Sequence, residues 1–517
     1  MPVIAIDVGS TFCKTAIFNG SRMLSYACRH HGYHCPADGW AEQDALDVWR
    51  ITSQIVHEAV KASGAGDAIQ AVCLSVQGDA MIPVDSGGVP LHAAVLGMDS
   101  RSHREAADFE SHFERGPLYS ATGMPCKPLN FITKVLWFER NFPELRARVW
   151  KYLHFEDYLA FQLARVPALD FSMASRTMAF DPAGKDWIPG LLEFAGIDPG
   201  HLGNVTPAGV PVGIIRATVA DEWGISRKAL LIAGGHNQCM AAIGSGVIEP
   251  HLACYSFGTT EVIGTCLSSA RTSPALLEGN FPCYCHAVAD RYFTMTLNQS
   301  GGLALEWFHE SLLQLDPKDG EAPERLAAGI AIWPSAVLFL PHLVGSGTPS
   351  CDRLSRAAFV GLSVKTERRD LLQAIIDAQA FEARLNLETL EHSDIQISDL
   401  RAVDRGARMR KALQVKATVL QRPIHTLRNP EAALMGAAML AQTAIGGFRD
   451  LEAARDECVR VATTIEPDRR AMPAYDEAYE RFRALSRTLN SFYHHWRPEQ
   501  DRVESSRPAA YPALAAR

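Results

Sequence analysis

The stretch that decides the fold is residues 3–18, VIAIDVGSTFCKTAIF, in which two apolar runs flank the turn Gly-Ser-Thr at 9–11. Both runs are rich in residues that favour strands, so each is predicted to be a β-strand. A second stretch, residues 253–265, ACYSFGTTEVIGT, repeats this plan around Gly258. The two units lie half a chain apart, too far for a solenoid repeat, and they predict a duplicated α/β fold.

The residues around these two stretches continue an α/β pattern. Asn19-Gly20 between apolar runs is a strong hairpin signal, and Asp44 stands where a helix N-cap is expected. Apolar periodicity predicts strands at residues 3–6, 13–18, 23–28, 69–74 and 335–342, and helices at residues 44–63, 130–142, 152–163, 370–391 and around 475–492.

Composition excludes several classes of protein. The chain has 517 residues, 47% of them hydrophobic, and a formal net charge of -8, which is unsuited to a nucleic-acid-binding protein. No apolar run approaches the roughly 20 residues of a membrane span, and the first residues have neither the basic nor the apolar region of a signal peptide. The twelve cysteines show no metal-binding spacing. We therefore expect a cytoplasmic globular protein with no membrane or nucleic-acid partner.

The two glycine turns have a chemical use in common. Glycine lets backbone N–H groups approach phosphate oxygens, and the neighbouring hydroxyls of Ser10 and Thr11 add donors. Asp7, directly before the first turn, is suited to holding a hydrated Mg²⁺ ion. One such turn is a weak signal, since it is also an ordinary hairpin turn. Two of them facing each other across a cleft would hold the phosphates of one nucleotide.

The whole chain resembles the FGGY carbohydrate kinases, a family that includes glycerol kinase, xylulokinase and gluconokinase. The resemblance rests on many short motifs in the same order as in the family. These are Asp7-Val-Gly-Ser-Thr with Lys14, Trp40-Ala-Glu-Gln-Asp44, Ser75-Val-Gln-Gly-Asp79, Met98-Asp-Ser-Arg101, Asp170-Phe-Ser-Met-Ala-Ser-Arg-Thr177, Gly234-Gly-His-Asn-Gln238, Gly258-Thr259, Gly301-Gly302, Gly345-Ser-Gly-Thr-Pro349, Asp404-Arg-Gly-Ala407 and Glu431-Ala-Ala-Leu-Met-Gly-Ala-Ala438.

The resemblance implies an α/β fold of two actin-like, ribonuclease-H-like domains that close on an interdomain cleft. We expect an N-terminal, sugar-binding domain at residues 1–246, a C-terminal, nucleotide-binding domain at residues 247–496 and a mobile tail at residues 497–517. The implied reaction is transfer of the ATP γ-phosphate to a hydroxyl of a small sugar or polyol, with Mg²⁺ as the metal. A homodimer is one assembly consistent with the family.

The resemblance also assigns roles to residues. Asp7 would orient Mg²⁺ through water, and the phosphates would lie near Ser10, Thr11, Lys14, Gly258 and Thr259. Gly302 and the loop Arg405, Gly406, Ala407 would flank the nucleotide. Sugar-binding groups are expected at Gln77, Asp79, Asp99 and Gln238.

Two positions depart from the family pattern. Asn237 stands where the family has its catalytic aspartate. An amide cannot accept the proton of the sugar hydroxyl. Loss of a general base typically lowers the rate by about a hundred- to ten-thousand-fold. Arg405 interrupts a glycine run, and it would be strained if its backbone needed a positive φ.

These departures leave two functions open. The first is an ATP-dependent, xylulokinase-like carbohydrate kinase that is impaired at Asn237. Phosphoryl transfer depends mainly on positioning and charge neutralisation, so some turnover survives loss of the base. The alternative is a catalytically silent homologue that binds a sugar or a nucleotide and acts as a regulatory protein. The sequence does not identify the sugar, and a ketopentose, an aldonate and a short polyol all remain open.

Overall fold

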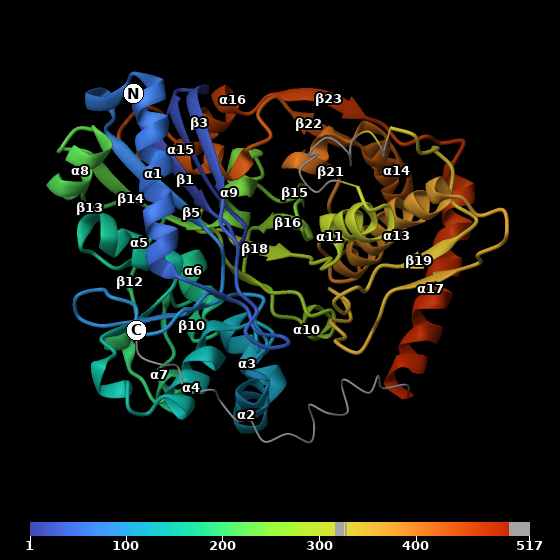
Figure 1. The fold of residues 1–517 in the computed structure, drawn as a ribbon, viewed down its shortest axis with the longest axis horizontal. Coiled ribbons are helices and arrows are strands. Elements are labelled where there is room, and N and C mark those ends of the chain that lie inside the picture. The colour runs from blue at the N-terminus through green and yellow to red at the C-terminus, as the bar shows by residue number, and fades with distance from the viewer. Residues whose placement is uncertain (316–324, 326–327, 496–517) are drawn as a thin grey trace.

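The computed structural model describes residues 1–315, 325 and 328–495, so the predicted tail at 497–517 lies outside the described residues. Two large sheets, one from each half of the chain, lie side by side (Figure 1). The first contains, in spatial order, β13 (Pro211–Ile214), β14 (Leu230–His236), β5 (Ala71–Val76), β1 (Pro2–Val8), β2 (Phe12–Asn19) and β3 (Arg22–His30). The second contains β17 (Tyr284–Cys285), β18 (Tyr292–Met295), β16 (Glu261–Leu267), β15 (Leu252–Phe257), β21 (Asp399–Val403), β22 (Ile424–Leu427) and β23 (Val461–Ile465).

The two sheets share one topology. In the first, β3, β2 and β1 are antiparallel neighbours, and β1, β5 and β14 run parallel. In the second, β18, β16 and β15 are antiparallel, and β15, β21 and β22 run parallel. The predicted duplication of an α/β unit is therefore confirmed, and the two glycine turns occupy equivalent places, between β1 and β2 and between β15 and β16.

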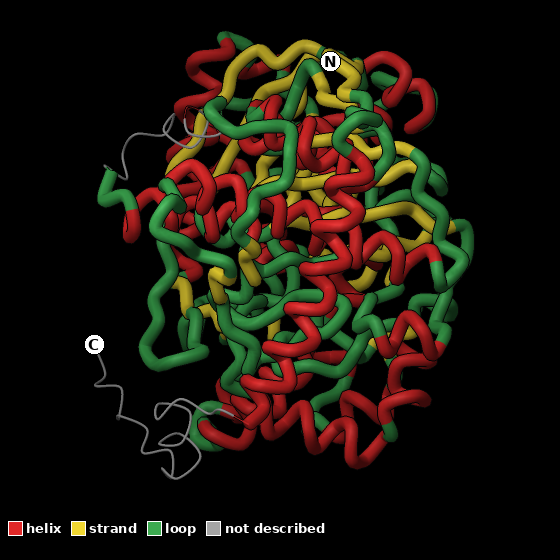
Figure 2. The backbone as a smooth tube through the Cα atoms, turned by 90° about the vertical axis from the view of Figure 1, so that its right-hand side faces the viewer, coloured by secondary structure: helices red, strands yellow, loops and turns green. Residues whose placement is uncertain are grey.

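Helices and small strand pairs flank the sheets, and Figure 2 shows most of the strands, in yellow, in the upper part of that view among helices and loops. The helices of the first half are α1 (Ala45–Ser63), α2 (His103–Phe113), α3 (Arg115–Thr122), α4 (Phe131–Asn141), α5 (Phe155–Ala164), α6 (Phe171–Arg176), α7 (Pro189–Phe194), α8 (Ala217–Trp223) and α9 (Asn237–Gly244). Those of the second half are α10 (Pro274–Glu278), α11 (Gly301–Trp307), α13 (Arg368–Glu391), α14 (Arg410–Leu420), α15 (Ala432–Ala444), α16 (Leu451–Cys458) and α17 (Met472–His495). The small pairs are β4 (Glu42–Gln43) with β7 (Ala94–Val95), β6 (Ile82–Val84) with β8 (Lys151–Leu153), β9 (Ala168–Asp170) with β12 (Asn204–Thr206), β10 (Phe180–Asp181) with β11 (Asp186–Trp187), and β19 (Leu338–Leu340) with β20 (Ala358–Val360).

Most predicted elements form near the expected residues. Asp44 caps α1, because its side chain accepts a hydrogen bond of 2.9 Å from the N–H of Leu46. The predicted helix at 152–163 is wrong at its start, since residues 151–153 form β8 and pair with β6. The predicted strand at 335–342 is shorter than expected at both ends, since β19 covers Leu338–Leu340; at its end, Pro341 has no N–H to extend the pairing. No helix in the described part of the chain is long and apolar enough to span a membrane.

Helices α9 and α15 interlock the two halves. Each follows the last parallel strand of its own sheet, yet α15 also lies on β1 and β5 of the first sheet, and α9 contacts β15 and β16 of the second. Figure 1 shows α15, in orange, among the strands of the first half. Met435 of α15 belongs to the same buried core as Val3 and Ala5 of β1. The chain that forms the second half thus supplies part of the core of the first.

Glycine allows these two helices to touch along their backbones. A Cβ atom on Gly244 would lie 1.9 Å from the carbonyl oxygen of Ala432, and one on Gly436 would lie 2.0 Å from that of Met240. Both distances are far below any contact that a real Cβ makes, and in both cases the obstacle is backbone, which cannot rotate away. Only glycine fits at positions 244 and 436 in this arrangement.

We expect Gly244→Ala and Gly436→Ala each to lower the free energy of unfolding by about 1–3 kcal/mol or more, because the added methyl forces two helix backbones apart. The matched control is Gly190→Ala in α7, where a Cβ meets no atom within 4 Å and the next residue is not proline. This control should be neutral or gain up to about 1 kcal/mol from higher helix propensity. Urea denaturation of the three variants and the wild type measures both effects. Equal stability of all four proteins would contradict the close crossing.

Candidate functional site

The first glycine turn places Asp7 at the end of β1, in the interior of the protein. Ser75, on the neighbouring parallel strand β5, donates a hydrogen bond of 2.6 Å to the Asp7 carboxylate. Burial raises the pKa of Asp7 to about 6, although Lys14 and the Ser75 hydroxyl act in the opposite direction. The carboxylate is therefore charged at neutral pH but close to its titration range.

Charged groups from both halves meet beside Asp7. The ammonium of Lys14, on β2, lies 2.8 Å from the carboxylate of Glu431, which directly precedes α15. The pKa of Lys14 is raised, since the carboxylates of Glu431, Asp7 and Asp404 outweigh the effect of burial. Asp404 follows β21 of the second sheet, and burial raises its pKa too. This group joins the first glycine turn to the loop at 404–407, as expected for residues that share a nucleotide.

The nucleotide-binding residues predicted in the second half form one cluster around Gly258. At the start of α11, the N–H of Gly302 donates a 3.0 Å hydrogen bond to the carbonyl of Gly258, and the N–H of Leu303 donates one of 3.0 Å to the carbonyl of Thr259. A Cβ on Gly302 would lie 2.4 Å from the Gly258 carbonyl oxygen, so this close approach requires glycine. Gly406 packs equally closely on Phe257, next to the same turn. The backbone of Gly258 and Thr259 and the side chain of Phe257 thus form the contacts of this cluster.

The positive φ considered for Arg405 occurs at the preceding residue, Asp404. Asp404 has a φ of 66°, whereas Arg405 is not among the described residues with a positive φ and begins a short 3₁₀ turn, Arg405–Arg408. Asp404 is held there by two contacts. Its N–H donates to the carbonyl of Pro430 at 3.1 Å, and its carboxylate accepts a 2.5 Å hydrogen bond from Ser256. Arginine at position 405 therefore requires no unusual backbone conformation.

Gln77 lies between the first glycine turn and the predicted sugar residues. Its amide donates to the carbonyl of Gly9 at 3.4 Å and to the side chain of Gln43 at 3.1 Å. Gln43 in turn donates to the carbonyl of Ser10 at 2.6 Å. The short strand β4 thus ties a predicted sugar-binding amide to the predicted phosphate turn.

Asp79 is buried and paired with Arg176 of α6. The guanidinium Nε donates to Asp79 at 3.1 Å, and a second donor from the same group completes a two-point contact. Lys134, fully buried in α4, donates to the carbonyls of Asp79 and Leu96 at 2.7 and 2.6 Å. Burial lowers the pKa of Lys134 to about 8. Two cations therefore hold the loop that carries Asp79.

Asp99 is also held inside the protein. It accepts hydrogen bonds of 2.7–3.0 Å from the guanidinium of Arg101 and one of 2.6 Å from the N–H of Ala41. Arg101 also lies 2.7 Å from Glu42 and stacks on Trp40 at 3.8 Å. Both carboxyl groups that sequence assigned to the sugar thus have an arginine partner.

Asn237 stands at the end of β14 as the first residue of α9. The register between β14 and β5 shifts between Ile232 and Gly235. Within this shift the backbones approach so closely that a Cβ on Gly234 would lie 1.7 Å from the carbonyl oxygen of Leu74. The turn leaves Asn237 and Gln238 half-buried and His236 buried. A Cβ on Gly78 would lie 2.9 Å from His236 Nε2 and 3.1 Å from Arg176 Nε, so the start of α9 adjoins the Asp79 loop.

His236, next to Asn237, is held by contacts within the protein. The imidazole Nδ1 lies 2.9 Å from the Tyr284 hydroxyl. The backbone N–H of His236 donates a hydrogen bond of 3.0 Å to the hydroxyl of Ser172. Burial, with Arg176 nearby, holds the pKa of His236 well below the usual range. The imidazole is therefore neutral, and its Nδ1 is already in contact with the Tyr284 hydroxyl.

Sequence reasoning assigned no role to several residues that shape the site. These are Gln43, Arg101, Lys134, Arg176 and Glu431, each of which contacts a residue distant in sequence. One local signal was available, since the lysine in Phe131-Ile-Thr-Lys-Val-Leu-Trp137 stands in an otherwise apolar helix. A cation in such a place is normally bound to buried oxygens.

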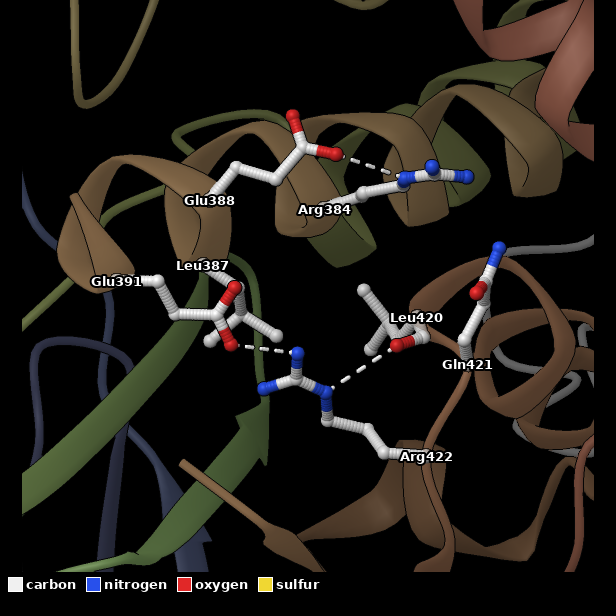
Figure 3. A pocket seen from close by; sticks show the side chains of 7 residues that line it. All are labelled: Arg384, Leu387, Glu388, Glu391, Leu420, Gln421 and Arg422. Atoms are coloured by element: carbon white, nitrogen blue, oxygen red, sulfur yellow. Dashed lines mark hydrogen bonds and ion pairs between the residues drawn. The ribbon is translucent and has the colours of Figure 1, made fainter. Parts of the chain in front are cut away.

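A separate pocket of about 290 Å³ lies between α13 and the end of α14 (Figure 3). Its charged side chains are already paired, Arg384 with Glu388 at 2.9 Å and Arg422 with Glu391 at 2.7 Å. It contains none of the predicted site residues. The first pair lies within α13, and the second joins Arg422, just beyond the end of α14, to the last residue of α13.

Comparison with known proteins agrees with this geometry. The model of the N-terminal domain of the FGGY family of carbohydrate kinases matches residues 2–244, and that of its C-terminal domain matches residues 253–445. A xylulose kinase of Staphylococcus epidermidis is 26% identical over 500 residues, covering 93% of this chain and 96% of the relative. A gluconokinase of Bacillus subtilis is 23% identical, covering 88% and 90%. The solved structure of xylulose kinase from Rhodospirillum rubrum superposes with a TM-score of 0.83 at 25% identity, covering 96% of this chain and all of that one.

The two family models together span most of the chain, and each contains one of the two duplicated sheets and its glycine turn. The solved relative has the same two-domain arrangement over nearly the full length. The chain belongs to the FGGY family of carbohydrate kinases, whose members are phosphotransferases.

Proposed function

We propose that the protein transfers the γ-phosphate of ATP to a hydroxyl of a small neutral sugar or polyol. The observation that carries this proposal is the meeting of Asp7 and Lys14 with Asp404 from the other half. Gln77, a predicted acceptor-binding residue, is hydrogen-bonded to the same glycine turn. Phosphate-binding groups and sugar-binding groups thus adjoin, as phosphoryl transfer between two bound substrates requires.

The donor set suits Mg-ATP. Asp7 would hold the metal through water, and Ser10, Thr11, Lys14, Gly258 and Thr259 would contact phosphate oxygens. The residues that would flank the nucleotide are Gly302 and the loop Arg405, Gly406 and Ala407. When bound, Mg²⁺ neutralises charge on the phosphates. A carboxylate with hydroxyls and backbone N–H groups is the chemistry that a hydrated Mg²⁺ ion and a polyphosphate need.

Charge favours a neutral acceptor over a sugar acid. Arg176 is bound to Asp79, Arg101 to Asp99 and Glu42, and Lys134 to two carbonyls. Each of these three cations is already occupied within the protein. Recognition of a carboxylate normally uses an arginine or lysine that is available to the ligand. A ketopentose or short polyol therefore fits these residues better than an aldonate.

Asn237 limits the rate in this proposal and leaves binding intact. Positioning and charge neutralisation remain available through the residues above, so turnover continues without a general base. Asparagine at position 237, in place of the family's aspartate, also favours a second function. In that case the protein is a silent homologue that binds nucleotide or sugar without turnover. The two are separated by whether phosphoryl transfer is measurable.

We expect Asn237→Asp to raise the phosphorylation rate by about a hundredfold or more, the range typical of a restored general base. ADP release is measured with Mg-ATP and a panel of ketopentoses, polyols and aldonates. A gain confined to neutral acceptors supports the proposed substrate class. Asn204→Asp, at an exposed position in β12, makes the same chemical change away from the site and should leave the rate unchanged. No turnover by wild type or Asn237→Asp would favour the silent homologue.

We expect Mg-ADP affinity to fall as the pH drops below about 6. Asp7 has its pKa raised to about 6, so it is charged and able to hold the metal above this pH and becomes protonated below it. Competition by one proton weakens binding by at most about tenfold per pH unit. Isothermal titration calorimetry from about pH 5 to about pH 8 measures the slope.

Asp7→Asn is the matched variant for this measurement, since an amide of the same size does not titrate near pH 6. It should bind Mg-ADP weakly at every pH, with a smaller slope than the wild type. A wild-type affinity that is constant over this pH range would show that Asp7 does not contribute to metal binding.

A further inference from the structure

Glu431 contacts the cation that the nucleotide phosphates are expected to use. Its carboxylate lies 2.8 Å from the Lys14 ammonium, and both side chains are 20% exposed. The two residues are 417 positions apart in sequence, so only the fold brings them together. Neither the family resemblance nor the comparisons assign a role to Glu431.

The Lys14–Glu431 contact belongs to one packed body. The helix that Glu431 precedes, α15, lies on the same sheet that carries Lys14. At the far end of α15, Gln442 accepts a 2.7 Å hydrogen bond from the N–H of Gly20 and donates one of 3.1 Å to its carbonyl. The helix is thus fastened at both ends to the β2–β3 hairpin. A motion of the second sheet relative to the first would not by itself separate Glu431 from Lys14.

The charge around Lys14 is unfavourable for a polyphosphate. Three carboxylates, those of Asp7, Asp404 and Glu431, act on this single ammonium. Asp7 is the predicted metal-holding group, and Asp404 is hydrogen-bonded to Ser256. Glu431 is the carboxylate that occupies Lys14 directly. An incoming phosphate meets a cation that is already paired.

We propose that Glu431 competes with the nucleotide phosphates for Lys14. In the free protein its carboxylate occupies the place of a phosphate oxygen beside the ammonium, and a bound nucleotide exchanges with it. Glu431 therefore acts through Lys14 as a positioning residue that sets nucleotide affinity. The identity of the ligand as Mg-ATP or Mg-ADP rests on the proposed function.

Isothermal titration calorimetry with Mg-ADP tests this exchange in the full-length chain. Glu431→Gln should tighten binding by about five- to twentyfold, because it frees Lys14 and removes one repelling charge from a partly buried site. Lys14→Met should weaken binding. In the Lys14→Met background, Glu431→Gln should give a clearly smaller gain, since no ammonium remains to be released. A misfolded variant cannot mimic a gain in affinity.

Glu452→Gln, on the exposed face of α16, is the control for the change in net charge, and it should leave the affinity unchanged. An unchanged or weaker affinity in Glu431→Gln would overturn the proposal, as would an equal gain with and without Lys14. The proposed function fails separately, when nucleotide binds but neither wild type nor Asn237→Asp phosphorylates any acceptor. Absence of Mg-ADP binding in all variants would overturn both.

Discussion

The close backbone crossing of α9 and α15 is the constraint on which the rest of the structure depends. Gly244 and Gly436 let the two helices approach until carbonyl oxygens replace side chains at the contact. Each helix also lies against the sheet of the other half, so the two duplicated units share one core. This crossing sets how the glycine turn of the first sheet faces the loops of the second. Asp7, Lys14 and Asp404 meet because of it.

The second organising feature is the pairing of buried charges. Asp79 and Asp99 are held by Arg176 and Arg101, and these contacts shape the loops rather than leave free carboxylates. Burying an ion pair is expensive unless its hydrogen bonds are satisfied, and here the arginines make two-point contacts. These pairs balance the buried charges around the residues that we propose bind the acceptor. Around Lys14 the balance is different, because carboxylates outnumber the cation.

Much of the fold could be predicted from local patterns. The strand–turn–strand units, the Asn19-Gly20 hairpin and the cap of α1 at Asp44 depend on neighbouring residues, and all formed where expected. The start of α5 was misplaced because residues 151–153 pair with a strand distant in sequence. The positive φ considered for Arg405 occurs at Asp404 instead. Backbone conformation in that loop is set by Ser256 and Pro430, which no local pattern reveals.

The sequence by itself determined the family, the duplicated topology and the residue types available for phosphate, metal and sugar. These depend on motif order and on apolar periodicity, which are properties of the chain. Only the tertiary structure decided which of these residues are free to act. Ion pairs such as Lys14 with Glu431, and Asp79 with Arg176, join residues far apart in sequence. Their geometry follows from helix and sheet packing, so a residue's chemistry can be read locally but its partner cannot.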